Sequence, residues 1–187
     1  VSGILQRIHT LETLIFLKQL IPSVEKVGFM VKKGPTGAAW IEQIKKDTQS
    51  SPVKVVEYRT PTNMPEALEM VKEMRETCDA LFIGAMQRIR DRDGNPLEDE
   101  AALPILTRAF GKPVFSNTRF RVQYGALCAV VDLPFEQGKT AADMLLKAMT
   151  GVSVKEIPIT RTQYGHRLIN IRTMKALGIK PSRTLLV

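Results

Sequence analysis

Short apolar runs alternate with longer segments of helical periodicity along most of the chain. The runs that we interpret as buried strands are residues 26–31, 53–58, 80–84, 113–116 and 126–131. Between them, apolar side chains recur every three or four residues, which is the spacing of one helix face. Strands that alternate with helices of this length predict an α/β fold, in which a mainly parallel sheet carries helices on both faces.

The expected helices have recognisable start and stop residues. Pro22 ends the first helix, and Asn63 is a good N-cap that begins the third. The other helices are expected at residues 37–49, 98–110 and 135–149, with the first at residues 10–20. We expect loops at residues 32–37 and at residues 88–99, the second being the longest and most mobile.

Length and composition limit the class of protein. The chain has 187 residues, which fits one domain or one lobe of a larger protein, and its formal net charge is +8. A basic balance permits contact with nucleic acid, anionic lipid or anionic solutes. The Lys and Arg residues are spread along the chain and are not interleaved with aromatic residues, so we expect no nucleic-acid partner.

Cysteine and histidine give no sign of a metal, a cofactor or a catalytic centre. Cys78 and Cys128 lie beside and within apolar runs, so we expect two buried thiols rather than a disulfide. His9 and His166 have no recognisable serine or cysteine partner, and we place His166 in a turn. Asp132 could be a general base by position, but we favour a cap on the helix that follows it. We expect no enzyme activity and no cofactor.

In an open parallel sheet, ligands bind beyond the carboxyl ends of the strands. That rule selects the loops at residues 32–37, 85–97, 117–124 and 132–135. Gly34 and Gly37 flank the start of a helix, where backbone N–H groups could hold a carboxylate or phosphate. Neither common phosphate-loop spacing is present, and a plain turn into a helix remains the alternative.

Two of these loops are rich in arginine. The guanidinium groups belong to Arg88, Arg90, Arg92, Arg119 and Arg121. They could form an anion site, because arginine binds carboxylates and phosphates with paired hydrogen bonds. The alternative is that acidic residues of the stretch 91–100 neutralise them. The sequence leaves both interpretations open.

Several motifs, taken in order, resemble one protein family. They are Val1-Ser2-Gly3-Ile4, Ile21-Pro22 leading to Val27-Gly28, Pro113 to Asn117, Gly125-Ala126-Leu127, Gly138 to Ala142, and an ending of strand 167–171, a helix stopped by Gly178, and Pro181 to Leu186. This order resembles the ABC-transporter substrate-binding proteins of the type that includes bacterial tryptophan and tyrosine binders. These have the type I periplasmic-binding-protein fold.

The resemblance implies two α/β lobes joined by a hinge of several crossings, which close around a solute. Residues 1–187 would be the second lobe, with hinge crossings within 132–160, and the first lobe would be absent. Helix 135–149 would pack on that first lobe, and without it the isolated lobe could form a homodimer. The expected location is periplasmic or extracytoplasmic, and a lipid anchor through a missing N-terminus is compatible with it. The expected partners are a small solute and an ABC permease.

The resemblance also implies a set of ligand contacts. Carried over by position, they are Lys33, Gly34, Thr36, Gly37, Ala85, Asn117, Thr118 and Asp132, to which Arg119 is added for an anionic solute. The solute would be amino-acid-like or a small anion. The chain differs from the family pattern at Lys33-Gly34-Pro35-Thr36 and at Met86 to Arg90, and these differences favour the anion. The alternatives are the extracytoplasmic sensing domain of a signalling protein and, third, a flavodoxin-like enzyme.

Overall fold

The central sheet is parallel except at one edge, as the alternation of strands and helices predicts. The computed structural model describes residues 1–180, so the motif Pro181 to Leu186 lies outside the described residues. The sheet has the order β10-β8-β7-β4-β2-β3. Its strands are β2 (Lys26–Met30), β3 (Lys54–Arg59), β4 (Ala80–Ile83), β7 (Val114–Phe115), β8 (Cys128–Asp132) and β10 (Gly165–Ile169). Only β10 pairs antiparallel, against β8.

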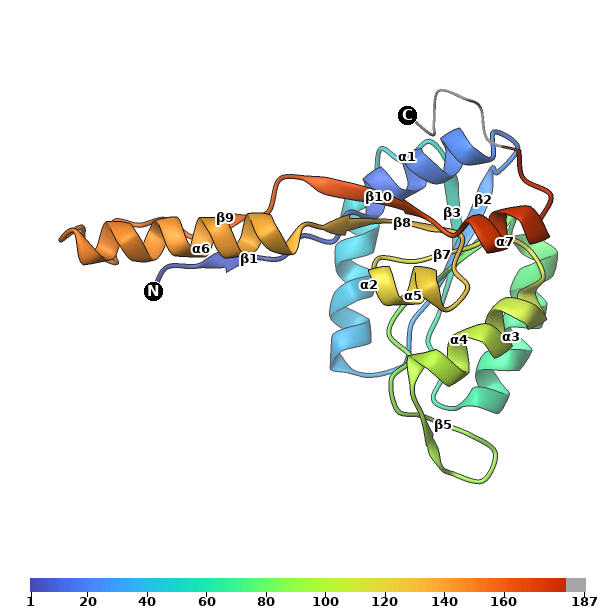
Figure 1. Cartoon of the computed structure of the whole chain (residues 1–187). Coiled ribbons are helices and arrows are strands. Elements are labelled where there is room, and N and C mark those ends of the chain that lie inside the picture. The colour runs from blue at the N-terminus through green and yellow to red at the C-terminus, as the bar shows by residue number, and fades with distance from the viewer. Residues whose placement is uncertain (181–187) are drawn as a thin grey trace.

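Helices cover both faces of this sheet (Figure 1). On one face lie α1 (Thr10–Leu20), α2 (Pro35–Asp47) and α7 (Ile171–Ala176), and on the other α3 (Met64–Thr77), α4 (Asp99–Phe110) and α5 (Arg119–Gln123). Each face of the sheet has its own hydrophobic core: the first core lies beneath α1, α2 and α7, and the second beneath α3, α4 and α5. Successive strand residues point to opposite faces, so Phe29 belongs to the first core and Met30 to the second. The α/β fold with helices on both faces is therefore confirmed.

Three phenylalanines form the centre of the first core. The ring of Phe29 lies 5.0 Å from that of Phe82 and 5.7 Å from that of Phe115, which meets it edge-on. Each ring comes from a neighbouring strand, β2, β4 or β7, and all three residues are buried. Aromatic pairs of this geometry add about 0.5–1.5 kcal/mol each beyond the burial of their area. This cluster fixes the relative positions of the strands whose ends carry the candidate site.

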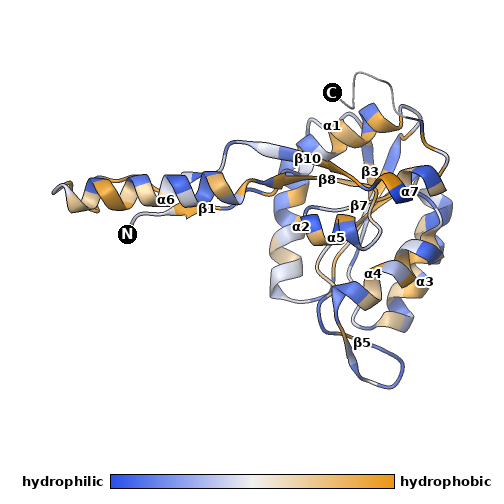
Figure 2. Ribbon diagram, viewed as in Figure 1, coloured by the Kyte–Doolittle hydropathy of each residue, from blue (hydrophilic) through white to orange (hydrophobic). Residues whose placement is uncertain are grey.

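An arm projects from the lobe (Figure 1). It consists of α6 (Pro134–Met149) and a two-stranded parallel sheet of β1 (Ile4–Leu5) and β9 (Thr160–Arg161). No residue of the described helix α6 is buried, although Phe135, Leu145 and Met149 are apolar. Figure 2 shows apolar residues along the arm as well as in the sheet. The chain passes between lobe and arm at three places: before α1, after β8 and before β10.

Some boundaries differ from those expected. Helix α2 begins at Pro35 rather than at residue 37, because proline is pre-organised for the first helical position. Residues 119–123, expected within a loop, form helix α5, which a Phe120–Tyr124 ring contact of 6.4 Å supports. The long loop 88–99 contains a hairpin of β5 (Ile89–Arg90) and β6 (Pro96–Leu97). His166 lies on β10 rather than in a turn.

The cysteines follow the prediction. Cys78 and Cys128 are free and buried. Burial raises the pKa of the Cys78 thiol to about 11 and that of the Cys128 thiol to about 12. Within residues 1–180, no group of three or more His, Cys, Asp or Glu side chains is placed to hold a metal ion. None of the helices in the described part of the chain has the length and apolar character needed to cross a membrane.

Candidate functional site

A pocket lies at the carboxyl ends of β2 and β4. It has a volume of about 500 Å³, and its lining includes the predicted contacts Lys33, Gly34, Thr36, Gly37 and Ala85. Trp40, Gln87 and Arg88 also line it. Five residues that the sequence selected, from two separate loops, therefore line one concavity. This is the edge at which open parallel sheets bind ligands.

Two glycines allow the backbone segments around this pocket to approach closely. A Cβ atom on Gly37 would collide with the backbone carbonyl oxygen of Lys32. A Cβ on Gly84 would lie 2.5 Å from a methyl group of Val31 and 3.2 Å from the ring of Trp40. A side chain at position 37 would push the start of α2 away from Lys32, and a side chain at position 84 would displace the side chains of Val31 and Trp40. The shape of the pocket therefore depends on both glycines.

The pocket carries positive charge. Its lining includes Lys32, Lys33 and Arg88 and no acidic residue. The Lys32 ammonium group donates a hydrogen bond to the carbonyl of Gln87, and the Lys32 amide donates to Ala85 O at 3.1 Å. The positive end of the α2 dipole adds to the field of these cations. An anionic group, such as a solute carboxylate, would be stabilised here.

The next predicted contacts lie on the loop after β7 and at the start of α5, and they are not part of the lining of this pocket. Asn117 and Thr118 precede α5, and Arg119 is its first residue. The Asn117 side-chain oxygen accepts a hydrogen bond of 3.1 Å from Arg121 Nη1. The buried hydroxyl of Thr118 has no hydrogen-bond partner within residues 1–180. Arg119 is exposed and forms no ion pair with any other described residue, so its guanidinium is available to a ligand.

Arg121 is buried against Asp99. Its Nε and Nη2 atoms donate hydrogen bonds of 2.9 and 2.7 Å to Asp99 Oδ2, and the side chains are only 2% and 6% exposed. Asp99 Oδ1 accepts a 2.8 Å bond from the Met86 amide. Burial lowers the pKa of Arg121, and the charge of Asp99 opposes that effect. For Arg121 the neutralisation alternative is therefore correct, and this residue braces three strand-end loops.

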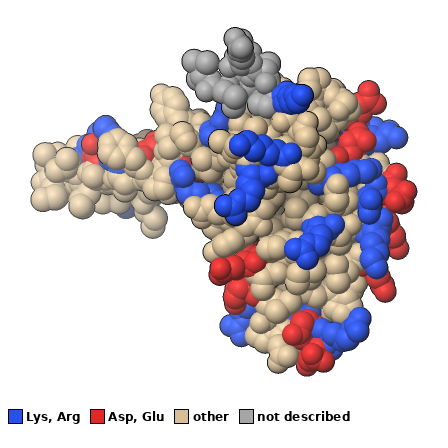
Figure 3. All heavy atoms as spheres, turned by 45° about the vertical axis from the view of Figure 1, so that its right-hand side comes forward, with Lys and Arg blue, Asp and Glu red and all other residues tan. Residues whose placement is uncertain are grey.

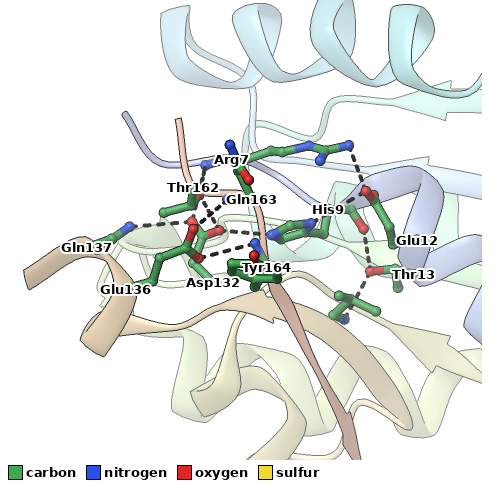
Figure 4. A network of polar contacts seen from close by, with 11 residues as sticks. Arg7, His9, Glu12, Thr13, Asp132, Glu136, Gln137, Thr162, Gln163 and Tyr164 are labelled. Carbon is green, nitrogen blue, oxygen red and sulfur yellow. Dashed lines mark hydrogen bonds and ion pairs between the residues drawn. The ribbon is translucent and has the colours of Figure 1, made fainter. Parts of the chain in front are cut away.

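Asp132 lies where the chain leaves the lobe for the arm, and it does not cap α6 as expected. The N-cap of α6 is Leu133, which makes no side-chain cap bond. Instead, Asp132 Oδ1 lies 2.9 Å from His9 Nε2 and accepts a 2.7 Å bond from the Thr162 hydroxyl (Figure 4). Asp132 Oδ2 accepts bonds from the Arg7 amide at 3.2 Å and from Gln137 at 3.5 Å. The capping prediction is wrong because Arg7, His9 and Thr162, which are distant in sequence, occupy both oxygens.

This carboxylate therefore joins all three crossings between lobe and arm. His9 belongs to the first crossing, Asp132 to the second and Thr162 to the third (Figure 4). His9 and Thr162 are each 1% exposed. The His9 carbonyl also accepts a 2.7 Å bond from the Thr13 hydroxyl, which in turn accepts a 3.0 Å bond from the Val130 amide of β8. The crossings are thus tied to the sheet as well as to one another.

A second carboxylate supports the third crossing. Glu136, in the first turn of α6, accepts bonds of 2.8 Å from the Gln163 amide and 3.2 Å from the Tyr164 amide (Figure 4). On the other side, Arg7 Nη2 lies 2.6 Å from Glu12 Oε1. These contacts extend the network from the arm to α1. A rotation of the arm would have to break several of them together.

A family model decides the identity. The model described as ABC transporter substrate binding protein matches residues 1–187, the whole chain. The chain belongs to this family. A search of curated proteins finds no match.

Solved structures show the fold of this substrate-binding protein. An ABC domain from Streptococcus pneumoniae in complex with L-Trp matches with a TM-score of 0.73 at 18% identity, over 100% of this chain and 62% of that one. A conserved domain protein from Vibrio cholerae matches with a TM-score of 0.71 at 17% identity, over 100% and 60%. The ligand-free, open structure of a substrate-binding protein with adhesive properties from Clostridium difficile matches with a TM-score of 0.71 at 19% identity, over 92% and 56%.

The substrate-binding protein described here spans less than two thirds of each of these neighbours. Other similar structures include a periplasmic ribose ABC transporter protein from Conexibacter woesei, with a TM-score of 0.58 at 10% identity, over 96% of this chain and 62% of that one. These structures share the type I periplasmic-binding-protein fold. The identities are too low to carry a ligand from any of them to this chain.

Sequence reasoning missed several important residues of this substrate-binding protein. Trp40 was not selected, although its position one turn after Gly37 on the predicted helix could have placed it beside the pocket. His9 was set aside because no serine or cysteine partner was recognisable, whereas its partner is Asp132. The two residues are 123 positions apart, and no local pattern connects them.

Proposed function

We propose that the pocket at the ends of β2 and β4 captures a small solute for delivery to an ABC permease. The observation that carries this proposal is the convergence of Lys33, Gly34, Thr36, Gly37 and Ala85 on one positively charged concavity. Asn117, Thr118 and Arg119, from the neighbouring loop, would complete the contacts. A preformed cleft with a few polar groups is the usual construction of small-molecule sites.

The charge of the pocket favours a solute with a carboxylate, either amino-acid-like or a small anion. The α2 N-terminus, Lys33 and Arg88 would bind that group. Trp40, which also lines the pocket, offers an apolar surface for the remainder of the solute. Asp132 was proposed as a direct contact, but its carboxylate is 5% exposed and already accepts bonds at both oxygens. These observations favour a role for Asp132 in the hinge.

We further propose that residues 1–187 form the second lobe of a two-lobe protein, with the hinge crossings around residues 132–160. The projecting arm supports this, since exposed Phe135, Leu145 and Met149 leave apolar surface for another lobe to cover. In the isolated chain, the same surface would favour a homodimer. Sedimentation velocity at increasing concentration tests this, and a strict monomer would contradict it. Proteins of this family are typically extracytoplasmic, and a lipid anchor would keep the protein near the permease.

Nuclear magnetic resonance of the isotope-labelled chain tests the proposed site. Half of the contacts of a closed cleft would be missing, so we expect weak binding, which chemical-shift titration can still detect. Amino acids, small carboxylates, inorganic phosphate and neutral sugars would be titrated separately. Shifts from a carboxylate should map to residues 33–37, 85–88 and 117–119 and disappear in Lys33→Ala. The matched control Lys54→Ala, at an exposed lysine on β3, should preserve them. Binding of neutral sugars alone, or shifts elsewhere, would contradict the proposal.

A further inference from the structure

The second half of the chain contains long stretches without acidic residues. No Asp or Glu occurs in residues 101–131 or in residues 157–187. These stretches supply most of α4, the helix α5, the edge strand β10 and the helix α7. Figure 3, which brings this side of the lobe forward, shows Lys and Arg side chains over its middle part and acidic side chains mainly along its borders. The charge of the molecule is therefore unevenly distributed in space.

A groove runs between α4, α5 and α7 on this side. It consists of two adjoining hollows of about 820 and 340 Å³, which share Arg108, Tyr124 and Arg172 in their linings. Residues 169–171 also line the larger hollow, and Lys112 and the apolar residues Ala176 and Leu177 line the smaller one. The groove thus combines cations with an apolar section.

Within residues 1–180, the cations of this groove have no acidic partners. Arg108 and Arg172 are exposed, and neither they nor Lys112 form an ion pair with any other residue within 1–180. Lys112 is held in place by the carbonyl groups of Arg75 and Cys78, which lie 2.5 and 3.0 Å from its ammonium nitrogen. By contrast, the buried Arg121 of the same region is neutralised by Asp99. The positive charge of the groove is therefore not neutralised by ion pairs within residues 1–180.

The groove lies away from the solute pocket. Helix α7 follows β10, which runs antiparallel to β8, so α7 starts at the opposite end of the sheet from Asp132. Arg108 is near the end of α4, just before β7 begins. Both arginines are thus at the amino ends of the parallel strands, whereas the solute pocket is at their carboxyl ends. The groove also lies away from the arm, so it stays accessible when a partner covers the arm (Figure 1).

We propose that this groove, which we name the α4–α7 groove, docks an acidic segment of a partner protein. Carboxylate side chains of that segment would pair with Arg108 and Arg172, since a guanidinium group binds a carboxylate through two parallel hydrogen bonds. An aliphatic side chain of the segment would occupy the hollow beside Ala176 and Leu177. The concave shape favours a protein segment over a flat lipid surface, and the volume is far larger than a single small anion needs.

Fluorescence anisotropy with a labelled peptide that alternates Glu with Leu tests this docking surface. We expect the chain to bind this peptide with an affinity that falls as salt is added, and to bind a matched Gln–Leu peptide poorly. The double variant Arg108→Glu/Arg172→Glu should weaken binding by about tenfold or more, because two charge-assisted pairs are lost. Lys46→Glu/Lys54→Glu removes the same charge from exposed positions on α2 and β3 and should change affinity by less than about twofold.

Other outcomes would overturn the proposal. An equal loss in both double variants would show that net charge alone attracts the peptide. Full competition by inorganic phosphate would indicate a site for a small anion. Binding to phosphatidylglycerol vesicles but not to the peptide would indicate a membrane surface. If Arg108→Glu/Arg172→Glu does not fold, Arg108→Gln/Arg172→Gln provides the same comparison, and unchanged peptide affinity in that variant would also contradict the proposal.

Discussion

His9 Nε2 and Asp132 Oδ1 lie 2.9 Å apart in a nearly solvent-free environment at the junction of lobe and arm. The pair connects the segment that enters the lobe to the segment that leaves it. The hydroxyl of Thr162, 2.7 Å from the same oxygen, adds the third crossing. A single carboxylate thereby connects the three segments of the chain that cross between lobe and arm. If the chain is one lobe of a two-lobe protein, as proposed above, these are the segments about which the lobes would move.

Removing this carboxylate should destabilise the chain and loosen the arm. We expect Asp132→Ala to lower the free energy of unfolding by about 3 kcal/mol, because His9 and Thr162 would remain buried without their partner. Urea denaturation measures the loss. Asp143→Ala, which removes the exposed pair with Lys139 on α6, should cost less than about 0.5 kcal/mol. Hydrogen exchange should quicken around residues 5–9 and 161–165 in Asp132→Ala only. Equal stability of the two variants would show that the network does not hold the junction.

The Arg121–Asp99 pair should matter for stability and for the shape of the strand-end loops. We expect Asp99→Ala to cost about 3–5 kcal/mol, since it leaves a buried guanidinium without its counter-charge and the Met86 amide without an acceptor. Arg121→Lys should also destabilise, because an ammonium group cannot reproduce the bonds to both Asp99 and Asn117. Thermal melting of both variants is the measurement. Wild-type stability in Asp99→Ala would mean that the pair contributes nothing to the fold.

Two glycine substitutions should act in opposite directions. Gly37→Ala places a methyl group against the Lys32 carbonyl and should destabilise the first turn of α2 while weakening solute binding. Gly138 lies on exposed α6, where an added methyl group meets no atom of residues 1–180 within 4 Å. Gly138→Ala should therefore raise the free energy of unfolding by about 0.5–1 kcal/mol through helix propensity. A destabilisation of the same size at both positions would contradict the pocket geometry.

The buried thiols predict a loss of stability at high pH. Burial raises the pKa of Cys128 from an ordinary 9.0 to about 12 and that of Cys78 to about 11. A raised pKa means that the folded state binds the proton more tightly, so this contribution is complete below pH 9 and declines as the pH rises through 11 to 12. Unfolding curves between pH 8 and 11 should show the decline begin, and Cys128→Ala should reduce it. Rapid iodoacetamide labelling of the folded chain at pH 8 would contradict this account.

The sheet could be predicted well from the sequence because its central strands are short runs of apolar residues that are buried in the structure. Phe29, Phe82 and Phe115 lie in three such runs, and all three are buried in one cluster. The start of α2 was placed too late, since Gly34-Pro35 signals a turn as readily as a helix start. Helix α5 was missed because its five residues are too few to show periodicity.

The candidate site was predictable only where it depends on strand-end loops. Lys33, Gly34, Thr36, Gly37 and Ala85 meet because parallel strands end at one edge, a rule that needs no side-chain detail. The role of Arg121 could not be predicted, because Arg119 and Arg121 differ only in which side of a short helix they occupy. The pairing of His9 with Asp132 depends on how the chain returns to the lobe from the arm. Such long-range contacts leave no local pattern in one sequence.

A crystal structure of the protein with its solute bound tests the central claim most directly. A carboxylate-bearing solute that gives shifts in the resonance titration would be the ligand used for crystallisation. We predict electron density for it in the pocket at the ends of β2 and β4, in contact with the α2 N-terminus, Lys33 and Arg88. Density for the solute in the α4–α7 groove, or anywhere away from residues 33–37, 85–88 and 117–119, would contradict the account.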